Sequence, residues 1–337
     1  MENKVITDVC IIGAGPVGLF AVFEAGLLKM RCHLIDVLPQ VGGQLSEIYP
    51  QKPIYDIPGF PAINAQELIE NLKEQIAPFR PTFTLGEKVE EVIKLETGEF
   101  LIRTSENSIV EARVIVIAGG LGCFEPRKPE LKNLARFEGR GVNYFIRNTE
   151  IYRDRHVVIA GGGDSALDWT LFLSGIAERV TLVHRSDSFR GAPDSAGKVF
   201  DLAGEGKIDL LLRTNVTGLV GEDHLEAVRL EHADGSAGGI KADFFIPLFG
   251  LTPRLGPIAE WGLNLHHAAI EVNTFDYATN VPGIFAIGDI NTYPGKLKLI
   301  LCGFHEAALM AQSAFHIVYP DKKRTFKYTT VYGVHGF

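Results

Sequence analysis

A strand, a glycine-rich turn and a helix follow one another twice in this chain, in the same register. The first turn is Gly13-Ala14-Gly15-Pro16-Val17-Gly18, and the second is Gly161-Gly162-Gly163-Asp164-Ser165-Ala166. A short apolar, β-rich run precedes each turn and an apolar helical stretch follows it. Two such copies predict an α/β chain with two doubly wound, Rossmann-like dinucleotide-binding domains.

The first turn carries the residues that a nucleotide diphosphate requires. Gly13 permits the tight turn, Gly15 lets the backbone approach the diphosphate, and Gly18 lets the helix pack on the strand. The helix N-terminus adds unpaired N–H donors. Asp36 ends the next apolar run, 18 residues after Gly18, where its carboxylate can accept hydrogen bonds from an adenosine ribose. This site fits either NAD or the adenosine half of FAD.

The second turn differs at the position that matches Asp36. The next run ends 18 residues after Ala166 in His184-Arg185, and Arg190 follows. Arginine suits a phosphate dianion through bidentate contacts, whereas an aspartate there would repel it. NADPH is therefore expected in preference to NADH. The expected NADPH-binding residues are Gly161, Gly163, Asp164, Ser165, His184, Arg185 and Arg190.

Composition excludes several other classes of protein. The 337 residues, 46% of them hydrophobic, suffice for about two domains. No apolar run approaches the roughly 18 residues of a membrane helix, and the first apolar run leads straight into the glycine turn, so a cytoplasmic protein without a signal peptide is expected. A net charge of −8 argues against nucleic acid as a partner. No histidine or cysteine spacing predicts a metal site.

Two further segments favour FAD at the first site. Gly42-Gly43-Gln44 is a flexible backbone with an amide side chain, placed soon after the second strand. The run 284–287 reads as a strand that stops at Gly288-Asp289, and a helix is expected over 300–315. A glycine-backed carboxylate suits the ribityl chain and pyrophosphate of a flavin.

The motifs together carry a resemblance to a known family. GAGPVG, GGQL, IYDIPGFP, VIVIAGG, GGGDSALDW, HRSDSFR and IFAIGDI occur in this order over nearly the whole chain. The sequence thereby resembles the thioredoxin-reductase-like flavoproteins. Within that group it is most similar to the ferredoxin (flavodoxin):NADP reductases, through the stretches 48–50, 256–263 and 293–296.

The resemblance implies a segmented architecture and a set of FAD contacts. The FAD domain would comprise residues 1–118 and 251–337, with the NADPH domain, 119–250, inserted into it. Tyr49 would stack on one face of the flavin, and Tyr328 of the C-terminal tail on the other face in a partner subunit, with Tyr332 or Phe337 as alternatives. A homodimer would follow. The expected FAD-binding residues are Gly13, Gly15, Val17, Gly18, Asp36, Gln44, Tyr49, Val89, Phe124, Asp289 and Thr330.

The disulfide reductases of this group carry a C-x-x-C motif where this chain has Tyr144 and Arg147. The chain's cysteines, Cys10, Cys32, Cys123 and Cys302, show no C-x-x-C spacing and read as reduced thiols. A dithiol relay is therefore not expected, and electrons should leave the flavin directly. Because a flavin accepts hydride from NADPH and releases electrons singly, it suits ferredoxin or flavodoxin as acceptor. No side chain is predicted to act as a catalytic acid or base.

Local charge is consistent with an acidic carrier protein. Residues 121–160 and 289–337 each carry a net charge of +3 against the −8 of the chain, and such patches would steer an acidic partner in a salt-dependent way. Solvated surfaces of mixed charge explain the counts equally well.

Three other functions stay open. They are an NADPH-dependent disulfide reductase with an external thiol, a general NADPH diaphorase, and a flavin-bound sensor without useful turnover.

Overall fold

The computed structural model describes residues 4–122, 125–252, 254–323 and 329–337. The chain forms two compact units. Unit 1 combines Met1–Cys123 with Pro253–Phe337, and unit 2 is Phe124–Thr252. The expected domain limits, after residues 118 and 250, lie near these boundaries. Each unit contains one of the two glycine turns.

Unit 1 is built on a seven-stranded sheet in the order β5-β2-β1-β8-β7-β6, with β20 paired to β8. Strand β7 runs antiparallel to its two neighbours, and the β5, β2, β1, β8 and β20 pairings are parallel. Near-continuous apolar runs suit the parallel strands because both of their faces are buried. The strands are β1 (Lys4–Ile12), β2 (Cys32–Asp36), β5 (Thr82–Leu85), β6 (Val89–Lys94), β7 (Phe100–Thr104), β8 (Ile109–Ile117) and β20 (Ile284–Ala286).

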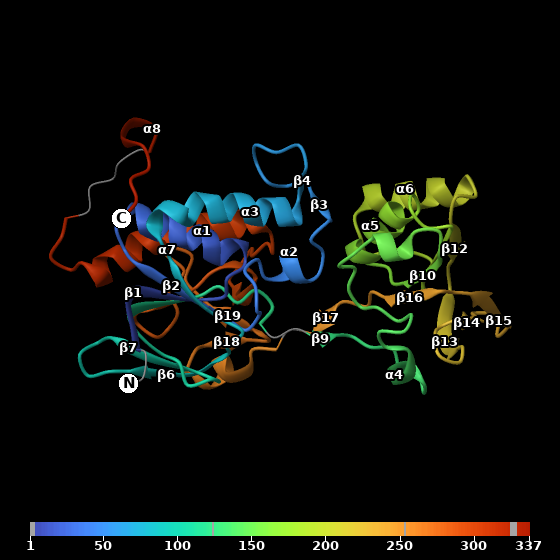
Figure 1. Cartoon of the computed structure of the whole chain (residues 1–337), viewed down its shortest axis with the longest axis horizontal. Helices are drawn as coiled ribbons and strands as arrows, with labels where there is room; N and C mark the ends of the chain where they lie inside the picture. Colours follow the sequence, from blue (N-terminus) through green and yellow to red (C-terminus); the bar gives the residue numbers. More distant parts are fainter. Residues whose placement is uncertain (1–3, 123–124, 253, 324–328) are drawn as a thin grey trace. The chain divides into compact units, whose positions relative to one another are not determined.

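Helices α1 (Pro16–Leu27), α3 (Ala65–Ile76) and α7 (Ile300–Val318) lie together beside this sheet (Figure 1). Their apolar residues form one core cluster with β1 and β8, and a second cluster includes Cys10, Ile35 and Phe100. The smaller elements of unit 1 are α2 (Gln44–Glu47), β3 (Pro53–Ile54), β4 (Ile63–Asn64), β18 (Leu265–His266), β19 (Ala269–Glu271), β21 (Asn291–Thr292), α8 (Thr329–Tyr332), and the 3-10 helices η1 (Ala77–Phe79), η3 (Gly256–Glu260) and η4 (Gly288–Ile290).

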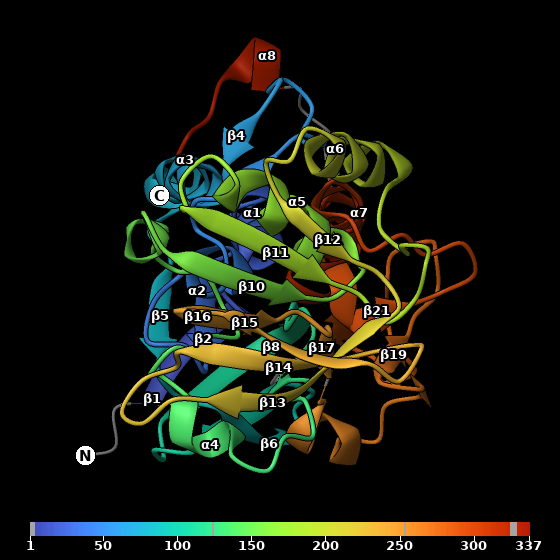
Figure 2. The ribbon, with the colours of Figure 1, turned by 90° about the vertical axis from the view of Figure 1, so that its right-hand side faces the viewer.

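Unit 2 has a four-stranded parallel sheet in the order β12-β11-β10-β16 and a separate antiparallel sheet, β13-β14-β15. Helices α5 (Asp164–Leu173) and α6 (Pro193–Gly204) lie on one side of the parallel sheet (Figure 2). The other elements of unit 2 are β9 (Glu125–Pro126), α4 (Leu134–Phe137), η2 (Glu150–Tyr152), β10 (His156–Ala160), β11 (Arg179–Val183), β12 (Asp209–Leu211), β13 (Thr214–Val220), β14 (Ala227–His232), β15 (Ala237–Lys241), β16 (Phe244–Pro247) and β17 (Leu251–Thr252).

The two strand–turn–helix units occur where the sequence predicts them, and the α/β fold class is confirmed. Strand β20 ends at Ala286, before the predicted stop, because the chain turns into η4 at Gly288, which has φ +77°. The antiparallel sheet of unit 2 was not predicted. In the described part of the chain, no helix is both long and apolar enough to cross a membrane.

A buried histidine in β2 should make the fold sensitive to acid. His33 is 2% exposed, and its ring nitrogens bond to Thr82 Oγ1 at 2.7 Å and Thr84 Oγ1 at 3.0 Å. Burial lowers the pKa of His33 to about 4. The unfolded chain, with its ordinary pKa of about 6.5, therefore takes up the proton first as the pH falls, and stability present above pH 6.5 is lost.

We expect the free energy of unfolding to fall by about 2 kcal/mol between pH 7 and pH 5 because of His33 alone. Denaturant unfolding of the wild type and of His33→Gln at both pH values measures this fall as the difference between their pH slopes. Equal slopes would contradict it.

Candidate nucleotide-binding sites

The glycine turns of the two units share one backbone geometry. Gly13 N donates to Ile35 O at 2.8 Å, and Gly161 N donates to Val183 O at 3.1 Å. The neighbouring strands close each turn in the same way, through Ala118 N to Ile12 O and Leu248 N to Ala160 O, both at 2.8 Å. Each turn therefore lies at the carboxyl ends of parallel strands, where α/β sheets bind nucleotides.

The first glycine of each turn faces a backbone carbonyl. A Cβ at Gly13, where φ is +112°, would lie 2.4 Å from Ala118 O, and one at Gly161 would lie 2.7 Å from Leu248 O. No real Cβ tolerates either contact. The first position of each turn therefore requires glycine for reasons of the fold alone.

The second glycine of each turn faces open space instead. A Cβ at Gly15 would meet nothing closer than Gly43 Cα, at 4.0 Å, and one at Gly163 would meet nothing within 4 Å. Gly15 and Gly163 are the N-caps of α1 and α5, and neither helix has a side-chain cap. The first N–H groups of both helices thus remain available to an anion.

Asp36 lies at the end of β2, where the sequence predicts a ribose contact. Its Oδ2 accepts from Ala14 N at 2.6 Å and its Oδ1 from Leu38 N at 2.9 Å. Burial raises the pKa of this carboxyl, and the two backbone donors oppose that rise. The carboxylate therefore holds the glycine turn and, at 9% exposure, keeps a limited accessible surface.

Segments from distant parts of the sequence pack on Val17, the fifth residue of this turn. A Cβ at Gly303 of α7 would lie 2.4 Å from Val17 Cγ2, and one at Gly288 would lie 3.4 Å from Val17, so α7 and η4 both pack on the start of α1. The side chain of Gln44 lies next to Gly120, in the segment that follows β8. A Cβ added at Gly120 would lie 3.2 Å from Gln44 Nε2.

Tyr49 and Asp289 lie within electrostatic range of each other. Burial raises the pKa of the Tyr49 hydroxyl to about 12, and the carboxylates of Asp289 and Asp56 add to the rise. Burial also raises the pKa of Asp289, while Lys296 and Lys298 lower it. An aromatic ring and a carboxylate thus share this part of unit 1.

The structure shows no direct contact between the first glycine turn and the remaining predicted FAD-binding residues that it describes. Val89 begins β6, two residues after Glu87, whose N–H donates to Asp36 O at 3.1 Å. Thr330 is exposed on α8. Phe124 and Tyr328 lie outside the described residues. Phe337 packs on Phe79 of its own unit, with ring centroids 6.4 Å apart.

The residues of unit 1 suit a large polar cofactor. Two buried side-chain oxygens lack a hydrogen-bond partner in the described chain, Ser46 Oγ and Asn291 Oδ1. Ser46 shares α2 with Gln44, and Asn291 comes directly after η4, which contains Asp289. Unsatisfied buried oxygens are unusual and are expected where a ligand or water supplies the missing donor.

In unit 2, the segment after β11 lies over the glycine turn. Arg190 N donates to Gly162 O at 2.7 Å, and Ala192 N donates to Asp164 Oδ1 at 2.7 Å. The ring of His184 occupies the space next to Gly162, where a Cβ would lie 2.1 Å from it. Asp164 and His184 therefore position this segment. Ser165 is exposed in the first turn of α5.

Arg185 and Arg190 are both exposed, and neither guanidinium has a hydrogen bond or ion pair within the described residues. Asp187, the one acid of this segment, pairs instead with Arg213, Oδ2 to Nη2 at 2.5 Å. The two free arginines thus keep their positive charge next to the glycine turn, as a 2′-phosphate site requires.

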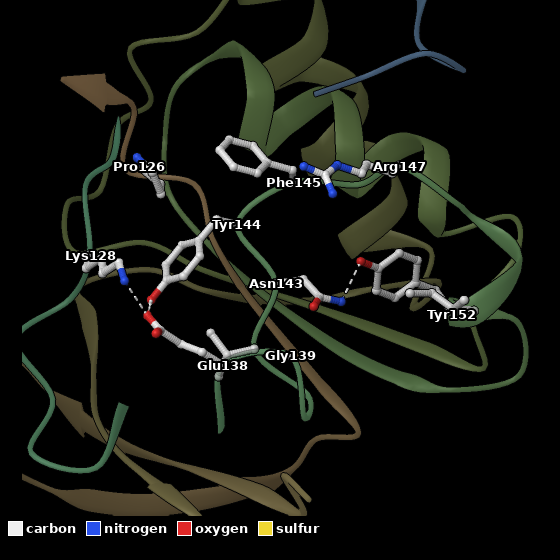
Figure 3. A pocket seen from close by; sticks show the side chains of 11 residues that line it. Pro126, Lys128, Glu138, Gly139, Asn143, Tyr144, Phe145, Arg147 and Tyr152 are labelled. Atoms are coloured by element: carbon white, nitrogen blue, oxygen red, sulfur yellow. Dashed lines mark hydrogen bonds and ion pairs between the residues drawn. The ribbon is translucent and has the colours of Figure 1, made fainter. Parts of the chain in front are cut away.

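Tyr144 and Arg147, at the positions of the absent dithiol, line a pocket of about 820 Å³ in unit 2 (Figure 3). Tyr144 donates its hydroxyl to Glu138 Oε1 at 2.7 Å, and Lys128 Nζ lies 2.7 Å from the same oxygen. Asn143 donates to the Tyr152 hydroxyl at 3.0 Å on the other side of the pocket. A hydrogen-bonded tyrosine thus stands where a cysteine relay would be.

The buried thiols of β1 and β2 offer no substitute relay. No cysteine occurs within 124–252. Burial raises the pKa of Cys10 to about 12 and also raises that of Cys32, so neither forms a reactive thiolate. Among the described residues, no group of His, Cys, Asp and Glu could hold a metal ion.

Ion pairs decide which residues carry the positive charge of the two basic segments and leave the net charge of each segment unchanged. Lys296 is buried against Glu306 and does not belong to an exposed basic patch. Within 121–160, Lys128 pairs with Glu138 and Arg153 with Glu150. The pairs cancel in sign, so the excess positive charge rests on the other basic residues of these segments.

Sequence reasoning missed the roles of Ser46, Asn291 and the Lys296–Glu306 pair. Sequence spacing carries no signal for a buried ion pair between a loop and a helix.

The chain is similar to a family of redox enzymes and to several named reductases. A family model described as pyridine nucleotide-disulphide oxidoreductase matches residues 7–307. "Ferredoxin--NADP reductase 1" of Christiangramia forsetii is 61% identical over 98% of this chain and 95% of its own. "Ferredoxin--NADP reductase" of Flavobacterium johnsoniae is 59% identical with the same coverage.

Solved structures share the fold. Thioredoxin reductase of Lactococcus lactis has a TM-score of 0.80 at 25% identity, covering 93% of this chain and 99% of its own. Bacillithiol disulfide reductase of Staphylococcus aureus has a TM-score of 0.75 at 22% identity, covering 95% of this chain and 100% of its own.

Proposed function

The chain belongs to the pyridine nucleotide-disulphide oxidoreductase family, and from this premise we propose that it is an FAD-dependent NADPH:ferredoxin or flavodoxin oxidoreductase. The observation that carries the choice of acceptor is the tyrosine network at Tyr144, where the disulfide reductases place a cysteine. The relatives above, named ferredoxin–NADP reductases, agree with it.

Each unit contributes one part of the reaction. The turn of unit 1, with Asp36, Gln44, Tyr49 and Asp289, would hold FAD. The turn of unit 2 would hold NADPH, with Arg185 and Arg190 on its 2′-phosphate. When bound, FAD supplies the chemistry, since it accepts a hydride and gives up electrons singly. The protein supplies binding, orientation and electrostatics, and no side chain needs to move a proton.

Two further features belong to the proposal. A cytoplasmic homodimer is inferred, in which the tail of one subunit covers the flavin of the other. Acidic carriers would approach the basic segments, so complex formation should weaken as salt screens the charges.

The function is tested by anaerobic NADPH oxidation with cytochrome c as terminal acceptor, with and without catalytic ferredoxin. We expect ferredoxin to accelerate cytochrome c reduction at least about tenfold. This gain should fall as the salt concentration rises from about 50 to about 500 mM, because salt screens the attraction between the two proteins. Reduction of a disulfide protein without any gain from ferredoxin would overturn the proposal. Equal rates with and without ferredoxin would indicate a general diaphorase.

A further inference from the structure

A buried ion pair lies next to Gly288, the residue before Asp289, in unit 1. Lys296 Nζ and Glu306 Oε1 are 2.5 Å apart, and the side chains are 6% and 0% exposed. Such a pair is weak evidence for stability, because desolvation of two charges offsets most of their attraction. Its hydrogen bonds indicate a more specific role.

The ion pair forms hydrogen bonds with both the N–H and the carbonyl group of Gly288. Gly288 N donates to Glu306 Oε2 at 2.6 Å, and Lys296 Nζ donates to Gly288 O at 2.9 Å. Gly288 has φ +77°, so it forms a turn that the backbone of most other residues would resist. The ion pair therefore fixes the position of this turn from both sides.

Two more donors converge on the same carboxylate. Asn291 Nδ2 donates to Glu306 Oε2 at 2.8 Å, and the Tyr293 hydroxyl donates to Oε1 at 2.9 Å. Asn291 Nδ2 also donates to Ala286 O at 2.9 Å, at the end of β20. Glu306 thus links β20, η4 and the loop before α7 to one helix.

The residue held by this arrangement is Asp289, which comes directly after Gly288. We propose that Lys296 and Glu306 are positioning residues that set the Asp289 carboxylate at the place where FAD binds. The proposal rests on the proposed function, because it assumes that unit 1 binds FAD. Neither residue is expected to touch the cofactor.

The pair is tested by replacing both charges together, in Lys296→Met/Glu306→Gln. The glutamine keeps an acceptor for Gly288 N, and no uncompensated charge is left buried. We expect FAD release from the holoenzyme, followed by flavin fluorescence, to be faster and the affinity for FAD to fall about tenfold, as loss of a charge-assisted contact implies. The matched control is Lys298→Met. It removes an exposed positive charge that lowers the pKa of Asp289, and it leaves the Lys296–Glu306 pair intact.

A double-mutant cycle separates positioning from structural support. If the pair acts through Asp289, then in an Asp289→Ala background the Lys296→Met/Glu306→Gln change should weaken FAD binding less than twofold further. The midpoint potential of the bound flavin should also shift in the pair variant.

Additive losses, or unchanged FAD affinity and midpoint potential in the pair variant, would overturn the proposal. Should that variant fail to fold, Tyr293→Phe, which removes one bond to Glu306, takes its place in the cycle. Wild-type protein that binds no FAD would contradict the proposed function instead, so the two failures are distinct.

Discussion

Replacing Arg185 and Arg190 together by alanine is expected to lower kcat/KM for NADPH by about 100- to 1000-fold and to leave kcat/KM for NADH within about threefold. Each guanidinium would contribute charge-assisted hydrogen bonds to the 2′-phosphate, a group that NADH lacks. The rate is measured as anaerobic flavin reduction in a stopped-flow instrument, so that the electron acceptor plays no part.

The structure gives this expectation its geometry. The segment that carries both arginines is held to the glycine turn through Arg190 N to Gly162 O and Ala192 N to Asp164 Oδ1. Asp187 is occupied by Arg213 and cannot neutralise its neighbours. The side chains are therefore free while their backbone is fixed, which limits the entropy lost on binding the phosphate.

Arg229→Ala is the control for a general change of charge. Arg229 is exposed on β14, in the separate antiparallel sheet of unit 2. It should leave both nucleotides unaffected. An equal fall for NADPH and NADH in the double variant would mean that the arginines support the fold of the segment and do not select the phosphate.

The sequence predicts those parts of the structure that local backbone geometry decides. The first glycines, Gly13 and Gly161, meet carbonyls that leave no room for a side chain, so the turn can be recognised from its letters. The offset from turn to Asp36 or His184 follows from the length of one helix and one strand. Such short-range constraints repeat in both units, and their repetition made the prediction of two nucleotide sites specific.

Other parts of the site depend on contacts between distant segments. Lys296 and Glu306 look like ordinary surface charges in the sequence, and only the packing of α7 shows that they are buried together. Ser46 and Asn291 carry no motif, yet they hold the unsatisfied oxygens. A buried ion pair or an orphaned oxygen is defined by its surroundings, which spacing along the chain does not describe.

The second glycines offer the sharpest test of both sites, because the protein itself leaves room for a methyl group there. Gly15→Ala should lower FAD affinity by about 100-fold and leave NADPH binding unchanged. Gly163→Ala should lower NADPH affinity by about 100-fold and retain its bound FAD. The added Cβ meets no protein atom closer than 4.0 Å at Gly15 and none within 4 Å at Gly163, so the Tm of FAD-free protein should change little.

The measurements are FAD content, FAD release and NADPH binding of each purified variant. Gly18→Ala serves as the contrast, because its Cβ would lie 2.0 Å from Gly13 O and should lower the Tm as well as FAD affinity. Normal binding of both nucleotides in Gly15→Ala and Gly163→Ala would show that neither diphosphate approaches its turn closely. Loss of FAD in Gly163→Ala with FAD retained in Gly15→Ala would exchange the assignments, placing NADPH in unit 1. Loss of FAD in Gly15→Ala together with loss of NADPH binding in Gly163→Ala is the only result that agrees with an acid after the first turn and arginines after the second.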